Sequence, residues 1–171
     1  KIKYLLPKRH TFGKMTLEIK DKDGNTVTSL SPSKSKGINI VDWGFTKKQP
    51  KVAKGKTLSR GGFTSPRVQE GIYNVEIKKG KDVFESKIEL IYDTITALSL
   101  IDRDKKHNIT MQLYDMTQEL AYLVYELDLI ISKLSIKPKL LKSFQELKET
   151  LVITKGDNYV GSVESQLREK M

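Results

Sequence analysis

The feature that most constrains the fold of this chain is a change of apolar repeat near residue 93. Before it, short runs of alternating apolar and polar residues are typical of β-strands. After it, apolar residues recur at steps of four and three from Ile109 to Leu134, which is the spacing of one helix face. We therefore predict an α+β fold with a β module over residues 1–92 and a helical module over residues 93–171.

A β-hairpin is predicted near the start of the β module. Residues 15–19 alternate in polarity, residues 21–25 (Asp-Lys-Asp-Gly-Asn) have the composition of a tight turn, and residues 26–30 form the returning strand. The same acidic run could suggest a calcium loop, but an EF-hand places glycine sixth and glutamate twelfth. Here glycine is fourth and Pro32 is twelfth, so a turn is the preferred interpretation.

Three more strands are predicted over residues 37–43, 71–77 and 83–90, the last two joined by a short turn. Trp43 is the single tryptophan, and we expect it to be a large buried plate in the core of a sandwich. The side chains expected to face inward from the last two strands are Tyr73, Val75, Ile77, Phe84, Ile88 and Leu90.

Three sequence blocks in this half, residues 17–27, 37–43 and 70–75, resemble a known module. They are similar to the immunoglobulin-like module of the flagellar hook-capping family. They also resemble the module that follows the β-propeller in secreted bacterial sortilin-like and BNR (Asp-box) glycosidase-like proteins. The resemblance implies an immunoglobulin-like antiparallel β-sandwich. One departure is that Trp43 precedes a long basic loop rather than a short glycine-rich turn.

The helical module is expected to form a small up-and-down bundle of three helices. The first covers residues 109–134, and its apolar positions, here called the seam, are Ile109, Leu113, Met116, Leu120, Leu123, Leu127, Ile130 and Leu134. Pro138 suits the first turn of a second helix, because its missing amide costs nothing there. A third stripe begins at Val163. We favour packing within one chain, and a dimer through the helices is the alternative.

Positive charge is concentrated in the first half of the chain. Residues 1–92 contain 20 Lys or Arg against 9 Asp or Glu, whereas the remainder contains 11 against 12. The long loop over residues 46–70 is rich in lysine, and loops of that length are uncommon unless they have a function or are mobile. The candidate polyanion-binding residues in this loop are Lys47, Lys48, Lys51, Lys54, Lys56 and Arg60.

No reaction centre is evident in the sequence. His10 and His107 are far apart, and we expect both on the surface rather than as metal ligands. The absence of cysteine excludes disulfides and thiolate chemistry. Asn108 begins a glycosylation triplet but is expected to cap the long helix. Acidic pairs such as Glu119 with Glu126 fall outside the seam, where solvated charge is expected. We predict no catalytic residues, no metal and no cofactor.

We therefore expect a non-catalytic accessory region of a larger secreted protein. The resemblance implies that it positions an upstream β-propeller domain of the same chain, at a secreted, periplasmic or cell-surface location in bacteria. The start at Lys1 is consistent with a fragment, and no apolar run is long enough to span a membrane. The alternative is a binding module for an anionic glycan or another polyanion through loop 46–70. Nucleic acid is disfavoured because the loop lacks interleaved aromatic residues.

Overall fold

The fold was obtained as a computed structural model, which describes residues 1–171 except 57–64, 94, 96–97, 134–137, 156–165 and 171. The chain divides into two compact units. The first, here called the β unit, contains Lys1–Lys48 and Pro66–Ser99. The second, the helical unit, contains Gln49–Ser65 and Leu100–Met171. The molecule thus combines antiparallel sheets with helices, as predicted for an α+β fold.

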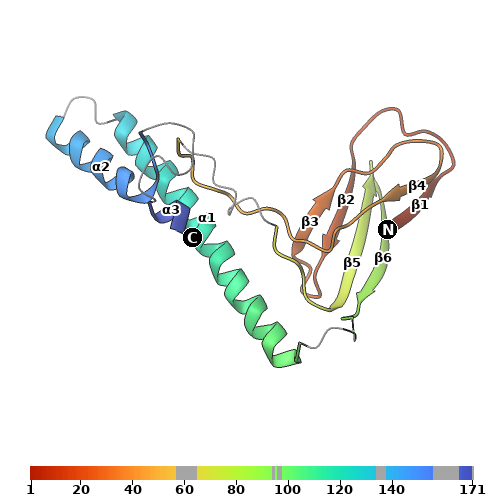
Figure 1. The fold of residues 1–171 in the computed structure, drawn as a ribbon. Coiled ribbons are helices and arrows are strands. Elements are labelled where there is room, and N and C mark those ends of the chain that lie inside the picture. The colour runs from red at the N-terminus through yellow and green to blue at the C-terminus, as the bar shows by residue number, and fades with distance from the viewer. Residues whose placement is uncertain (57–64, 94, 96–97, 134–137, 156–165, 171) are drawn as a thin grey trace. The chain divides into compact units, whose positions relative to one another are not determined.

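The β unit contains two antiparallel sheets (Figure 1). A four-stranded sheet has the order β3-β2-β5-β6, and a two-stranded sheet pairs β1 with β4. The bounds of the six strands are Ile2–Leu6 for β1, Met15–Lys20 for β2, Thr26–Leu30 for β3, Gly37–Val41 for β4, Gly71–Lys79 for β5 and Asp82–Leu90 for β6. Strands that are distant in sequence are therefore neighbours, because β2 pairs with β5.

One hydrophobic cluster contains buried side chains from both sheets. Its alternating positions on β2 and β5 explain why these strands form, since every second side chain leaves water. Leu17 and Ile19 are completely buried, and Trp43 is 5% exposed. The remaining buried members are Ile2, Leu6, Met15, Val27, Tyr73, Val75 and Ile77.

The sequence-based strand predictions are confirmed in the described residues, with one missed strand and one wrong side-chain prediction. Strand β1 was missed, although Ile2, Tyr4 and Leu6 alternate with more exposed neighbours. Phe84 was expected to be inward but is 56% exposed. Phe84 lies opposite the buried Ile77 of β5, but it stands on β6, the edge strand of the sheet. The hydrophobic cluster includes Ile77 and does not extend to Phe84. Ile88 and Leu90 are partly buried against the cluster, as expected.

The hairpin turn between β2 and β3 is held by the carboxylate of Asp21. It accepts hydrogen bonds from the amides of Asp23 (3.0 Å) and Asn25 (2.8 Å), and from the Asn25 side chain (3.2 Å). Burial opposes ionisation, but these hydrogen bonds prevail and hold the pKa of Asp21 below its usual value. The carboxylate is thus engaged in closing the turn.

The helical unit contains α1 (Leu100–Lys133), α2 (Pro138–Leu151) and the short α3 (Leu167–Lys170). The long helix is confirmed up to Lys133, and Leu134 lies outside the described residues. It begins at Leu100, so Asn108 lies inside it and the prediction of a cap there was wrong. The polar residues between Leu100 and Ile109 are also helical, so the helix extends beyond the apolar repeat that predicted it. Val163 and Met171 lie outside the described residues.

Helices α1 and α2 run antiparallel (Figure 1). Near the end of both helices, Lys148 of α2 forms an ion pair with Asp128 of α1. Val152, directly after α2, shares a buried cluster with Val124 of α1. This register places α2 against the last third of α1.

The seam of α1 is only partly covered. Leu120 and Leu127 are buried, whereas five other seam residues are at least 40% exposed. Two reasons apply. Helix α1 extends about 51 Å and α2 only about 21 Å at 1.5 Å per residue, so the early seam positions lie beyond α2. Beside α2, the buried face runs through Leu120, Val124 and Leu127, so Leu123 and Ile130 lie off that face. The expected up-and-down packing is present for α1 and α2, and it covers part of the described seam. The exposed seam positions are Ile109, Leu113, Met116, Leu123 and Ile130.

A segment from the long loop, residues 49–56, packs with the helices. Ala53 is 4% exposed and belongs to the cluster with Leu120 and Val124. The Lys56 amide donates to the Ile153 carbonyl (2.7 Å), and the buried guanidinium of Arg168 donates to the Ala53 carbonyl (3.0 Å). The helical unit therefore includes chain from between β4 and β5. The division at residue 92 remains a prediction.

Within the described residues, none of the helices combines the length and apolar character needed to cross a bilayer.

Candidate functional site

The structure distributes the candidate lysines of the long loop between the two units. Lys47 and Lys48 belong to the β unit, where their amides donate to the carbonyls of Pro66 (2.9 Å) and Val27 (3.0 Å). Lys51, Lys54 and Lys56 belong to the helical unit and are exposed. Arg60 lies outside the described residues. A joint site for all six therefore remains a prediction.

Trp43 has a structural environment. Its ring packs edge-on against Tyr73 (centroids 5.3 Å apart) and Phe45 (5.4 Å). Its Nε1 donates to the Thr46 carbonyl at 3.0 Å, so the one polar atom of the indole is satisfied. Phe45 has a φ of 56°, an uncommon conformation for a residue with a side chain, and it brings the two rings together. The prediction that Trp43 is a buried core residue is confirmed.

His10 belongs to the β unit and His107 to the helical unit. His10 and His107 are both half-buried rather than fully on the surface, and His107 lies within α1. Glu119 and Glu126 are exposed, as predicted. In the part of the chain that the structure describes, no group of three or more His, Asp or Glu side chains could hold a metal ion.

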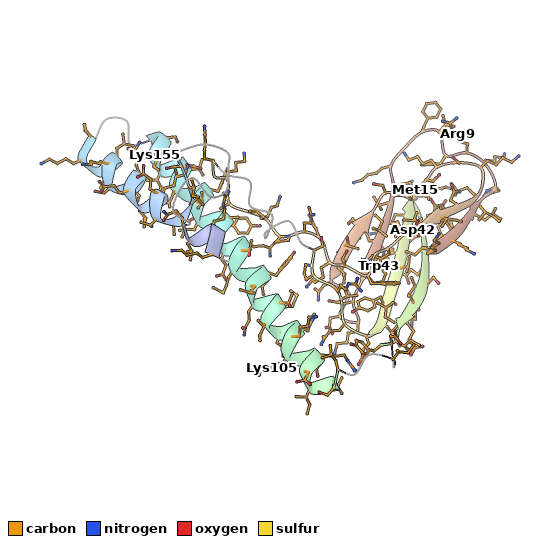
Figure 2. The ribbon with its side chains drawn as sticks, viewed as in Figure 1. Arg9, Met15, Asp42, Trp43, Lys105 and Lys155 are labelled. Carbon is orange, nitrogen blue, oxygen red and sulfur yellow. The ribbon has the colours of Figure 1, made fainter. Side chains whose placement is uncertain are left out.

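A different basic surface is created by the topology of the β unit. Because the strands are antiparallel, the segments 7–14, 31–36 and 80–81 all leave the sheets at the same end. We call this surface the basic end, and Arg9 lies at its outer edge in Figure 2, beyond Met15 at the start of β2. Three connections that are far apart in sequence thus form one surface.

Hydrogen bonds join the segments of the basic end. The His10 amide donates to the Lys34 carbonyl (3.0 Å), and the Lys34 ammonium donates to the Gly13 carbonyl (2.8 Å). The Gly80 amide reaches the Lys14 carbonyl at 3.5 Å. Gly13 has a φ of 92°, which side-chain-bearing residues rarely adopt, so glycine is needed for this turn.

The charge of the basic end has one sign. Its three segments contain no Asp or Glu, and their basic residues are Lys8, Arg9, Lys14, Lys34, Lys36 and Lys81. Among the described residues, none of the six forms an ion pair with a carboxylate. The nearest acidic residue in the chain, Asp82, pairs with Lys79 (3.8 Å). Uncompensated like charges on one surface attract anions over a Debye length.

Exposed apolar side chains accompany these charges. Phe12 is 86% exposed within the first segment. Leu5 and Ile38 are 66% and 75% exposed and lie opposite each other on β1 and β4, next to where the first two segments begin and end. The surface therefore combines cations with apolar groups.

The sequence analysis did not identify the basic end. It located the charge excess in the first half of the chain but assigned it to the loop with most lysines. A detectable signal was present, because both 7–14 and 31–36 contain basic residues and no acidic ones. Their proximity depends on the pairing of β1 with β4 and of β2 with β5, which the sequence pattern does not specify.

Comparisons with protein families, with curated proteins and with solved structures found no match for this chain. The resemblance to sortilin-like and BNR proteins accordingly stays a prediction.

Proposed function

We propose that this chain is a non-catalytic binding region whose β unit binds an anionic partner through the basic end. The observation that carries the proposal is the convergence of six basic side chains on one end of the β unit, where the bordering carboxylate, Asp82, pairs with Lys79. A structural role would not require this bias, because solvated surfaces usually mix both signs. The opposite end has the usual mixture, since Asp21, Lys22 and Asp23 share one turn.

We further propose that the β unit is an immunoglobulin-like sandwich that serves as a scaffold for this surface. In support, the Tyr73 hydroxyl donates to the Gln69 carbonyl four residues upstream (2.8 Å), as in the tyrosine corner of such sandwiches. Burial, followed by the charge of Asp21, raises the pKa of Tyr73, so the hydroxyl remains a donor at neutral pH. Trp43 packs against the same ring.

Retention on immobilised heparin, a generic polyanion, tests the binding proposal. We expect Lys8→Glu/Arg9→Glu to elute at clearly lower salt than the unmodified chain, because about two phosphate-like contacts are reversed. The matched control is Lys22→Glu/Lys87→Glu, which changes net charge equally at exposed positions outside the basic end. A third pair, Lys51→Glu/Lys54→Glu, tests the loop instead. Equal shifts for the first two pairs would contradict a defined site.

An accessory role in a larger secreted protein is the second candidate. It is favoured by the exposed seam of α1, because five apolar side chains in water are a typical packing surface for another domain. Hydrogen exchange along α1, compared between this chain and any longer protein that contains it, would test this role. Protection of Met116 and Leu123 from solvent in hydrogen exchange is the expected result, and unchanged exchange along α1 would count against it.

A further inference from the structure

The anionic partner can be specified from the exposed apolar side chains in the basic end and on the adjoining strands β1 and β4. A purely ionic partner, such as an acidic glycan, would leave Phe12, Leu5 and Ile38 in water. A bilayer surface accepts both kinds of group, because lysines contact the headgroup phosphates while apolar side chains enter the interface. Nucleic acid would use aromatic stacking, but Leu5 and Ile38 are aliphatic and cannot stack on bases.

We infer that the basic end docks the β unit onto the surface of an anionic phospholipid bilayer, with Phe12 entering the headgroup region. This inference rests on the proposed function and names its partner. The position of the residues supports it, since Phe12 lies between Arg9 and Lys14 in one exposed segment. Leu5 and Ile38 lie opposite each other, close in sequence to Lys8 and Lys36. Each apolar residue therefore has a basic residue within three positions in the sequence.

The hydrogen bonds of the basic end favour this mode of binding. Hydrogen bonds from the Lys34 ammonium and the His10 amide hold segment 7–14 against segment 31–36. Phe12 therefore lies in a turn whose backbone is fixed on both sides. A pre-organised loop loses less conformational entropy when it binds a surface. Each cation near an anionic membrane strengthens binding about fivefold. We therefore expect reversible attachment that depends on the sum of several such contributions.

Vesicle co-sedimentation of the full chain tests the inference. We expect binding to vesicles of phosphatidylcholine mixed with phosphatidylglycerol and none to phosphatidylcholine alone. Phe12→Ser should weaken vesicle binding by about tenfold, the effect of withdrawing one aromatic side chain from the interface. The same variant should elute from heparin like the unmodified chain. Ile72→Ser is the control, because Ile72 is 55% exposed at the opposite end of β5.

A fluorescence measurement reports insertion directly. The chain has one tryptophan, the buried Trp43, so Phe12→Trp adds a single exposed fluorophore. We expect the emission of the added residue to shift to the blue with mixed vesicles.

Heparin retention that depends on Lys8 and Arg9, combined with no vesicle binding or no emission shift, would overturn the bilayer inference and leave the proposed function intact. The bilayer inference would also be overturned if a single-stranded oligonucleotide displaced the chain from heparin more strongly than mixed vesicles do. Heparin retention independent of both cations would overturn the proposed function itself.

Discussion

At the scale of single residues, the core of the β unit was largely predictable. Tyr73, Val75 and Ile77 lie at every second position of β5, and this two-residue period specifies which side chains leave water. Phe84 follows the same period but is exposed. Alternation identifies the face of a strand, and the burial of that face depends on what covers it. The alternating pattern does not predict that β6 is an edge strand of the sheet.

The ion pairs of Glu76 provide a prediction about pH. Hydrogen bonds from Lys78 and Lys20 lower the pKa of Glu76, and its carboxylate oxygens lie 2.8 Å and 2.9 Å from the two ammonium groups. A lowered folded-state pKa means that the stabilisation is fully present above the unfolded value, roughly 4.3. It is lost as the pH falls through the folded value. Unfolding by urea should therefore show a smaller acid-induced loss of stability for Glu76→Gln than for the unmodified chain.

The control for this prediction is Glu89→Gln. Glu89 lies on β6 opposite Ile72, away from Glu76, and is exposed. It should lose stability between pH 7 and pH 3 about as the unmodified chain does. If Glu76→Gln follows the unmodified chain across the whole range, the ion pairs do not stabilise the fold.

At the scale of elements, α1 was predicted well and its surroundings were not. The heptad spacing indicates a helix because the apolar positions fall on one face. The spacing does not give the length of the partner, and α2 covers only the last third of α1. Nor does any pattern in residues 49–56 predict that Ala53 packs between helices, since a single small residue in a basic loop has no periodicity.

The contact of Gly55 with Arg168 tests how this segment is held. A methyl group on Gly55 would lie 2.6 Å from Nη1 and 2.7 Å from Cζ of Arg168. We expect Gly55→Ala to destabilise the helical unit by about 1 kcal/mol, because the guanidinium must move and gives up its hydrogen bond to the Ala53 carbonyl. Urea unfolding followed by the helical circular dichroism signal measures this cost. In an Arg168→Ala background the same change should cost under about 0.5 kcal/mol, because the obstructing group is gone.

The matched control for this pair is Gly44→Ala in the β unit, where an added methyl group meets nothing within 4 Å. It should leave the helical signal unchanged. An equal cost of Gly55→Ala with and without Arg168 would show that the two residues do not contact each other in solution.

At the scale of the whole molecule, the distribution of charge depends on topology. Composition gives a net charge of +10 and its excess in the first half of the chain. Only the strand order brings segments 7–14, 31–36 and 80–81 together, and strand order depends on long-range pairing that local patterns do not encode. A sequence-based search for charge therefore selects the loop with most lysines, whereas the fold gathers cations from short connections.

The most direct test of the basic end is an NMR titration of the uniformly ¹⁵N-labelled chain with a short heparin-derived oligosaccharide. Backbone amide shifts report which surface meets the anion. We predict that the largest changes fall in residues 7–14, 31–36 and 80–81, and that they are abolished by Lys8→Glu/Arg9→Glu. Changes centred on residues 47–56, or spread evenly over the surface lysines, would contradict the account.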